Sequence, residues 1–182
     1  MRPAVEAGAT GVTRHVIQGE QCVSEDPQEV LATLLGSCVA ACLHDPVAGI
    51  GGMNHFLLPG DAGGGERSHA ERYGVHAMEL LVNALLARGA ARSRLEAKLF
   101  GGASTMQGLS DIGAMNAAFA KRFLQRETIR ITSECLGGSR GRRIQYWPVS
   151  GRARRIFMGA AEPVPTARPP RPVPAAGALE LF

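Results

Sequence analysis

The sequence contains no apolar run of the roughly 18 or more residues that a membrane-spanning helix needs. Its first fifteen residues, MRPAVEAGATGVTRH, also lack the apolar segment and small-residue cleavage site of a signal peptide. These absences argue against membrane insertion and secretion, so we expect a cytoplasmic protein. With 182 residues, of which 45% are hydrophobic, the chain is long enough to bury the core of one domain.

The chain has few cysteines, and they show no regular spacing. The four are Cys22, Cys38, Cys42 and Cys135. In a reducing compartment this pattern predicts free thiols rather than a disulfide framework.

Zinc binding is a second use of cysteine that the spacing disfavours. Cys38, Cys42, His44 and His55 are all of ligand type. On one extended segment, however, residues 38, 42 and 44 span about 20 Å, which a single ion cannot bridge without a sharp bend in the chain. We therefore expect no bound metal, and we expect no cofactor.

Acidic residues are absent from residues 135–161, although the whole chain carries a net charge of only +4. Six arginines fall in this stretch: Arg140, Arg142, Arg143, Arg152, Arg154 and Arg155. The planar guanidinium group suits carboxylates or phosphates. The segment is therefore a solvated hairpin face, a surface for an acidic protein, or a nucleic-acid site. We expect no nucleic acid, because the nearby aromatics form no recognisable stacking motif.

The composition divides the chain into three parts. Residues 1–12 are small and polar and predict a flexible N-terminus. Residues 13–160 carry the periodic patterns of one folded domain. Residues 161–182 contain six of the eleven prolines and predict an extended, disordered tail that cannot join a sheet.

Within residues 13–160, strands precede and follow two helices. Apolar residues in 71–90 recur at helical spacing through Met78, Leu81, Val82 and Leu85, and Gly89 is placed to end that helix. A second helix begins near Ser110 or Asp111 and presents Met115, Phe119 and Phe123. Strands are expected over 15–23, 31–37, 39–45, 49–59, 95–100, 128–132, 142–147 and 154–158. This order predicts an α/β or α+β fold whose helices cover a mixed sheet.

The stretch TLLGSCVAACLHDPVAGIGGMNHFLLP, residues 33–59, holds the most reactive side chains. Cys38 follows a Gly36-Ser37 turn, whose backbone N–H groups could line an oxyanion site. If the chain forms a hairpin turning near 46–49, Cys38 and His55 fall within one or two residues of opposite positions. A histidine there could activate the thiol.

A third group is needed to orient the imidazole, and the residues alone leave three candidates open. Thr33 lies five residues before Cys38, and Asn54 and Ser37 compete with it. We also expect Gly36, Ser37 and Asn54 to contact substrate. From composition and spacing alone, a buried structural Cys/His pair is still more common than a catalytic one.

The motifs TLLGSCVAACLHDP, GIGGMNHFLLP, KLFGGA, DIGAMN and LGGSRGRRIQY resemble the CheD family of chemoreceptor glutamine deamidases over residues 15–158. The resemblance implies a three-layer α/β sandwich like that of cytotoxic-necrotising-factor deamidases. It also implies a catalytic set in which Cys38 is the nucleophile, His55 the base and Thr33 the third member.

The reaction implied by this resemblance converts selected glutamines of methyl-accepting chemotaxis receptors to glutamate, through a cysteine thioester. A CheC-type phosphatase is the implied protein partner. A chemotaxis adaptor, which docks on receptors or the phosphatase and for which catalysis is secondary, is the alternative.

Overall fold

The computed structural model describes residues 11–59, 67–104 and 112–159, so most of the predicted N-terminal segment and all of the predicted tail lie outside the described residues. The elements in chain order are β1 (Thr13–His15), β2 (Gln21–Ser24), β3 (Val30–Leu35), β4 (Val39–Asp45), β5 (Ile50–Asn54), α1 (Arg67–Ala87), a 3-10 turn (Arg92–Arg94), β6 (Glu96–Gly101), α2 (Ile112–Arg126), β7 (Arg130–Leu136), β8 (Arg142–Trp147) and β9 (Arg152–Phe157). No helix among the described residues is long and apolar enough to cross a membrane.

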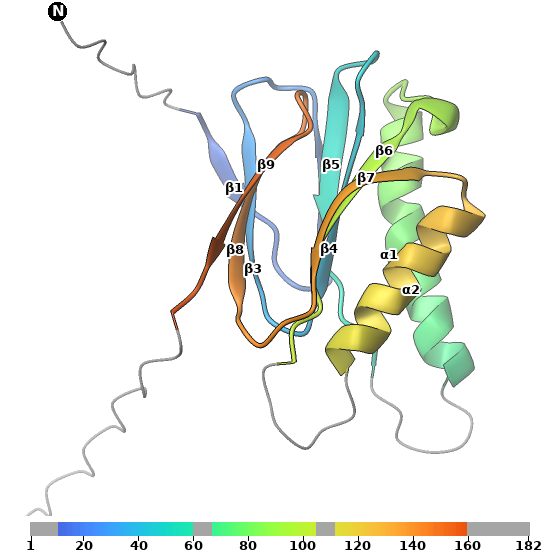
Figure 1. The fold of residues 1–182 in the computed structure, drawn as a ribbon. Coiled ribbons are helices and arrows are strands. Elements are labelled where there is room, and N and C mark those ends of the chain that lie inside the picture. The colour runs from blue at the N-terminus through green and yellow to red at the C-terminus, as the bar shows by residue number, and fades with distance from the viewer. Residues whose placement is uncertain (1–10, 60–66, 105–111, 160–182) are drawn as a thin grey trace, which may run out of the picture.

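The fold has three layers, two of them sheets and the third the pair of helices (Figure 1). A four-stranded sheet has the order β1-β3-β8-β9, and a five-stranded sheet has the order β2-β5-β4-β6-β7. Each sheet is mixed, because β1 runs parallel to β3 and β6 runs parallel to β7 while the other pairs are antiparallel. The predicted three-layer α/β arrangement is confirmed, with the five-stranded sheet in the middle and the four-stranded sheet as the outer layer.

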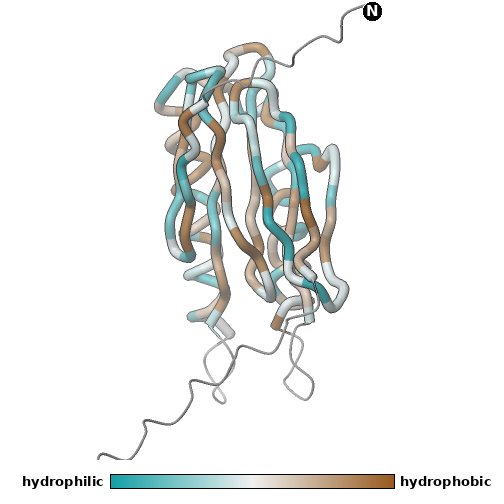
Figure 2. The backbone as a smooth tube through the Cα atoms, turned by 90° about the vertical axis from the view of Figure 1, so that its left-hand side faces the viewer, coloured by the Kyte–Doolittle hydropathy of each residue, from teal (hydrophilic) through white to brown (hydrophobic). Residues whose placement is uncertain are grey.

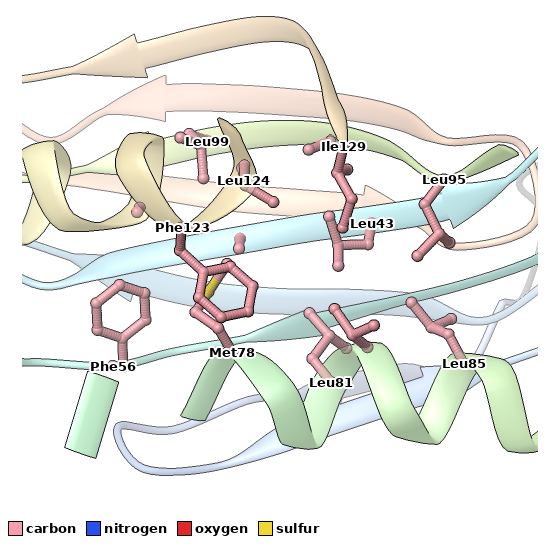
Figure 3. Packing of buried hydrophobic residues seen from close by; sticks show 14 of the residues in the cluster. Leu43, Phe56, Met78, Leu81, Leu85, Leu95, Leu99, Phe123, Leu124 and Ile129 are labelled. Atoms are coloured by element: carbon pink, nitrogen blue, oxygen red, sulfur yellow. The ribbon is translucent and has the colours of Figure 1, made fainter. Parts of the chain in front are cut away.

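The main core lies between the helices and the five-stranded sheet (Figure 3). In α1, Met78, Leu81 and Leu85 point to the sheet and are fully buried, as the helical spacing predicted. Gly89 has a φ of +95°, a value that favours glycine, and lies just past the end of α1. In α2, Phe119 and Phe123 are buried, but Met115 is 37% exposed, so the predicted apolar face is narrower than expected.

A smaller core fills the space between the two sheets. It contains Val16, Leu31, Leu35, Ala40, Cys42, Met53, Phe100, Ile144 and Tyr146. Because successive strand residues face opposite sides, Thr33 shares the inward face of β3 with Leu31 and Leu35 and is buried there.

The expected single strand over residues 15–23 is wrong. Residues Thr13–His15 pair with β3 in one sheet, whereas Gln21–Ser24 pair with β5 in the other. Residues 16–20 therefore connect the two sheets, and we refer to them as the strap.

The β4–β5 turn is fixed by Asp45, whose side chain is fully buried. Its carboxylate accepts hydrogen bonds from the N–H groups of Val47, Ala48 and Ala91 and pairs with Arg94 at 2.8 Å. Burial alone would raise the pKa of this carboxyl, but Arg94 and the three N–H donors hold it below its ordinary range. The ionised Asp45 thus fixes the conformation of the turn in the hairpin that carries Cys38 and His55.

No helix of residues 11–59, 67–104 and 112–159 covers the outer face of the four-stranded sheet (Figure 2). Hydrophilic and hydrophobic residues alternate along its strands, as expected when only one side of a sheet is buried.

Candidate active site

Cys38 lies where the chain passes from one sheet to the other, between the end of β3 and the start of β4. Three successive backbone carbonyl groups at this crossing accept hydrogen bonds. Ala103 N–H donates to the Gly36 oxygen at 2.8 Å, the Asn116 amide donates to the Ser37 oxygen at 3.0 Å, and Gly102 N–H donates to the Cys38 oxygen at 2.8 Å. The backbone around the thiol is therefore fixed on three successive residues.

Gly101 makes this arrangement possible. It has a φ of +113°, and a Cβ atom at this position would collide with the carbonyl oxygen of Cys38. Only glycine allows β6 to approach the crossing so closely. The FGG motif noted in the sequence is thus explained by close backbone packing.

His55 follows β5, so it lies on one side of the hairpin while Cys38 lies on the other. Val39 pairs with Phe56 and Cys42 pairs with Met53, so the same register places Ala40 opposite His55. Cys38 is two residues further along, on the face that His55 shares, which makes the two residues diagonal neighbours. The predicted register, within two residues of directly opposite, is confirmed.

Thr33 contacts the imidazole directly. Its Oγ1 lies 2.9 Å from His55 Nδ1 and also donates a hydrogen bond to the Val16 carbonyl at 2.7 Å. His55 Nδ1 lies 3.2 Å from the same carbonyl. Because a carbonyl oxygen can only accept, the contact with Val16 favours the tautomer in which Nδ1 carries the ring proton and Thr33 Oγ1 accepts from it as well.

This tautomer leaves His55 Nε2 with a lone pair. Nε2 is buried and has no hydrogen-bond partner among the described residues. A buried acceptor without a partner is costly, and active sites are among the places where such atoms occur. The arrangement leaves Nε2 available as a proton acceptor.

Of the three residues expected to contact substrate, Asn54 faces away from the thiol, whereas Gly36 and Ser37 adjoin it. Asn54 is 1% exposed, accepts a hydrogen bond from Ala41 N–H and donates to the Ala77 carbonyl on α1. Its amide therefore faces the helices, on the opposite side of the strand from His55. Gly36 and Ser37 are half-buried and adjoin the thiol, as their sequence positions require.

The family model described as CheD chemotactic sensory transduction matches residues 57–155. The chain belongs to the CheD family. A relative from Acidiphilium cryptum, named probable chemoreceptor glutamine deamidase CheD, is 56% identical and aligns over 100% of both chains. A relative of the same name from Sinorhizobium medicae is 55% identical over 96% of this chain and 98% of its own. These CheD alignments extend across residues 33–55, which the family model does not reach.

Solved structures resemble this CheD chain more distantly. A Neisseria meningitidis protein of family DUF152 superposes with a TM-score of 0.45 at 10% identity, covering 71% of this chain and 63% of that one.

Burial sets the charge state of the Cys/His pair in this CheD member. It raises the pKa of the Cys38 thiol, an effect that the residue's own backbone N–H partly offsets. It lowers the pKa of His55, although the hydrogen bond to Val16 opposes this. Near neutral pH both pKa shifts favour the uncharged forms, a thiol and a neutral imidazole.

These pKa directions predict slow alkylation of Cys38 at neutral pH. Since the pKa is raised, the thiolate fraction is smaller than in a free cysteine, and the rate should keep rising above pH of about 8.5. Iodoacetamide labelling followed by peptide mapping measures this rate for each cysteine separately. A Cys38 rate that levels off below the pH at which a cysteine peptide does so would contradict the prediction.

Sequence reasoning missed the strap, and it left the role of Asn116 open between a functional residue and a structural hydrogen-bonding group. The Val16 carbonyl positions both Thr33 and His55, and Asn116 ties α2 to the Cys38 crossing. Gly19, which has a φ of +88°, was the available sign that the strand over 15–23 is interrupted. Within the parts of the chain that the structure describes, no three His, Cys, Asp or Glu side chains gather as a metal site would require.

Proposed function

We propose that this CheD member is a cytoplasmic chemoreceptor glutamine deamidase with Cys38 as nucleophile, His55 as base and Thr33 as the group that orients the imidazole. The observation that carries the proposal is the 2.9 Å contact between Thr33 Oγ1 and His55 Nδ1, which orients the imidazole and leaves Nε2 as a buried atom without a hydrogen-bond partner among the described residues. The names of the full-length relatives supply the substrate class, a chemoreceptor glutamine.

The reaction proceeds in two halves. His55 Nε2 takes the Cys38 proton, the sulfur bonds to the side-chain amide carbon of the glutamine, and a tetrahedral oxyanion forms. His55 then gives its proton to the amide nitrogen as the carbon–nitrogen bond breaks, which releases ammonia and leaves a thioester. In the second half, His55 takes a proton from water as the oxygen attacks the thioester carbon. The carbon–sulfur bond then breaks, His55 returns the proton to the leaving sulfur, and the product carboxylic acid ionises to glutamate.

The proposal is tested by incubating the purified chain with the cytoplasmic fragment of a methyl-accepting chemotaxis receptor. Peptide mass analysis should show the increase that accompanies conversion of an amide to an acid, at defined glutamines and together with ammonia release. If the fragment binds but no glutamine changes mass, the proposal fails for that receptor and the adaptor function is favoured.

We further propose that one basic surface of this chain binds an acidic surface on receptors and on a CheC-type phosphatase. The support comes from a group of side chains on the uncovered face of the four-stranded sheet, here termed the basic face: Leu34, Arg143, Trp147, Arg152, Arg154 and Ile156. Leu34 and Ile156 are 50% and 44% exposed. Among the described residues none of these three arginines forms an ion pair, which leaves their charge available to a partner.

Reversing two charges on the basic face tests this docking. Arg143→Glu combined with Arg154→Glu should raise the KM for the receptor fragment by about tenfold and leave kcat unchanged, because rim charges act on association more than on chemistry. Arg142 is unsuitable, since it is 1% exposed and donates to the carbonyls of Cys135 and Gly137. The matched control is Arg122→Glu with Arg126→Glu, an equal charge change on α2. Equal KM changes in the two variants would show a general charge effect and no docking at the basic face.

A further inference from the structure

The strap is anchored on both sides of Gln18. Val16 N–H donates to the Ala32 carbonyl at 2.9 Å, and Gly19 N–H donates to the His55 carbonyl at 2.7 Å. In return, His55 N–H donates to the Glu20 carbonyl at 3.0 Å. The backbone of Gln18 is therefore fixed relative to His55, even though its side chain is exposed.

The Gln18 side chain reaches the nucleophile. Its Oε1 lies 3.4 Å from Cys38 Sγ and accepts the thiol hydrogen bond. The neighbouring carboxylate is engaged elsewhere, because Glu20 Oε2 accepts from Ile17 N–H within the strap at 3.1 Å. A neutral carboxamide, and no charged group of the strap, thus contacts the reacting sulfur.

A carboxamide can serve both states of the thiol. Its oxygen accepts from the neutral S–H group, as observed, and half a turn about its last bond presents Nε2–H in the same place. A thiolate has lost its proton and can only accept hydrogen bonds. The same is true of the oxyanion that forms next to it, so both need a hydrogen-bond donor. Glutamine is one of the few side chains that supply an acceptor and a donor of nearly equal shape.

We propose that Gln18 is a further catalytic residue, whose Nε2–H donates to the oxyanion of the tetrahedral intermediate once Cys38 has attacked. This inference rests on the proposed deamidation by Cys38. Donors aimed at developing negative charge are among the largest contributions to acyl transfer, and loss of one buried donor costs roughly 100- to 1,000-fold in kcat. Gln18 is exposed, so the expected loss is smaller, about 10- to 100-fold.

The test compares Gln18→Ala and Gln18→Glu. Both variants should lower kcat for the receptor fragment by about 10- to 100-fold with KM changed less than about threefold, because the donor acts after binding. Glutamate keeps the length and the acceptor oxygens but has no N–H, so it should be at least as damaging as alanine. The matched control is Gln21→Glu, the same charge change three residues along on an exposed position of β2.

A second readout does not require deamidase activity. A carboxylate beside Cys38 Sγ disfavours the thiolate, so Gln18→Glu should slow iodoacetamide labelling of Cys38, whereas Gln21→Glu should not. A wild-type chain that fails to deamidate would overturn the proposed function, and this labelling would still show whether Gln18 contacts the sulfur.

Three results would overturn the inference. The first is a Gln18→Glu variant whose kcat stays within about twofold of the wild-type value. The second is equal loss in Gln18→Glu and Gln21→Glu. The third is conversion of Gln18 itself to glutamate in the wild-type chain but not in Cys38→Ala, which would make Gln18 a substrate of its own active site.

Discussion

Replacing Cys38 with alanine should reduce ammonia release from receptor glutamines by at least about a thousandfold, because the thioester route then has no nucleophile. The fold should survive, since Cys38 is only half-buried and its carbonyl still accepts from Gly102 N–H in the variant. Ammonia release and peptide mass analysis measure the loss, and circular dichroism with a urea titration checks the fold.

The matched control for Cys38 is Cys135→Ala. Cys135 is also half-buried, and its sulfur accepts from Arg142 and Arg155, away from the Cys38 crossing. It should keep activity near the wild-type value. If Cys38→Ala deamidates at a rate similar to Cys135→Ala, another residue is the nucleophile.

Replacing His55 with glutamine should lower kcat by about 100- to 10,000-fold, the usual range for loss of a general base. Glutamine keeps a polar side chain in the buried pocket and leaves the backbone pairing with the strap intact. It cannot take the Cys38 proton or return it to the leaving ammonia. The measurement is kcat for the receptor fragment, with iodoacetamide labelling of Cys38 as a check that the thiol remains accessible.

Thr33→Val provides the graded comparison for His55. Valine has nearly the shape of threonine but no hydroxyl, so His55 Nδ1 retains only the Val16 carbonyl at 3.2 Å. The loss in kcat should therefore be smaller than for His55→Gln. A Thr33→Val variant with unchanged kcat would mean that Val16 alone orients the ring, and a His55→Gln variant within tenfold of wild type would remove His55 from the mechanism.

Much of the site was predictable because it depends on local pattern. The turn beginning at Asp45 and the two-residue alternation of strands together bring Cys38 and His55 to one face of the hairpin. The same alternation separates the candidates for the third group. Asn54 precedes His55 directly, so its side chain must face the other side of the strand, whereas Thr33 lies on the inward face of β3.

The remaining features depend on pairings between distant segments, which no local pattern records. The sequence predicts one strand over residues 15–23, yet Thr13–His15 and Gln21–Ser24 pair within different sheets. The contact of Gln18 with Cys38 follows from that arrangement, and the contact of Asn116 with the Ser37 carbonyl depends on where α2 lies on the five-stranded sheet. The prediction that Met115 belongs to the buried face of α2 was wrong for a related reason. Which apolar residues of α2 are buried depends on the part of the sheet that the helix covers.

The crossing at Cys38 has a consequence for how activity is gained and lost. Thr33 belongs to the four-stranded sheet, His55 follows a strand of the five-stranded sheet, and Cys38 lies on the chain between them. Under the proposed assignment, neither half contains the full set of groups by itself. We therefore expect a partly unfolded chain that retains only one sheet to be inactive.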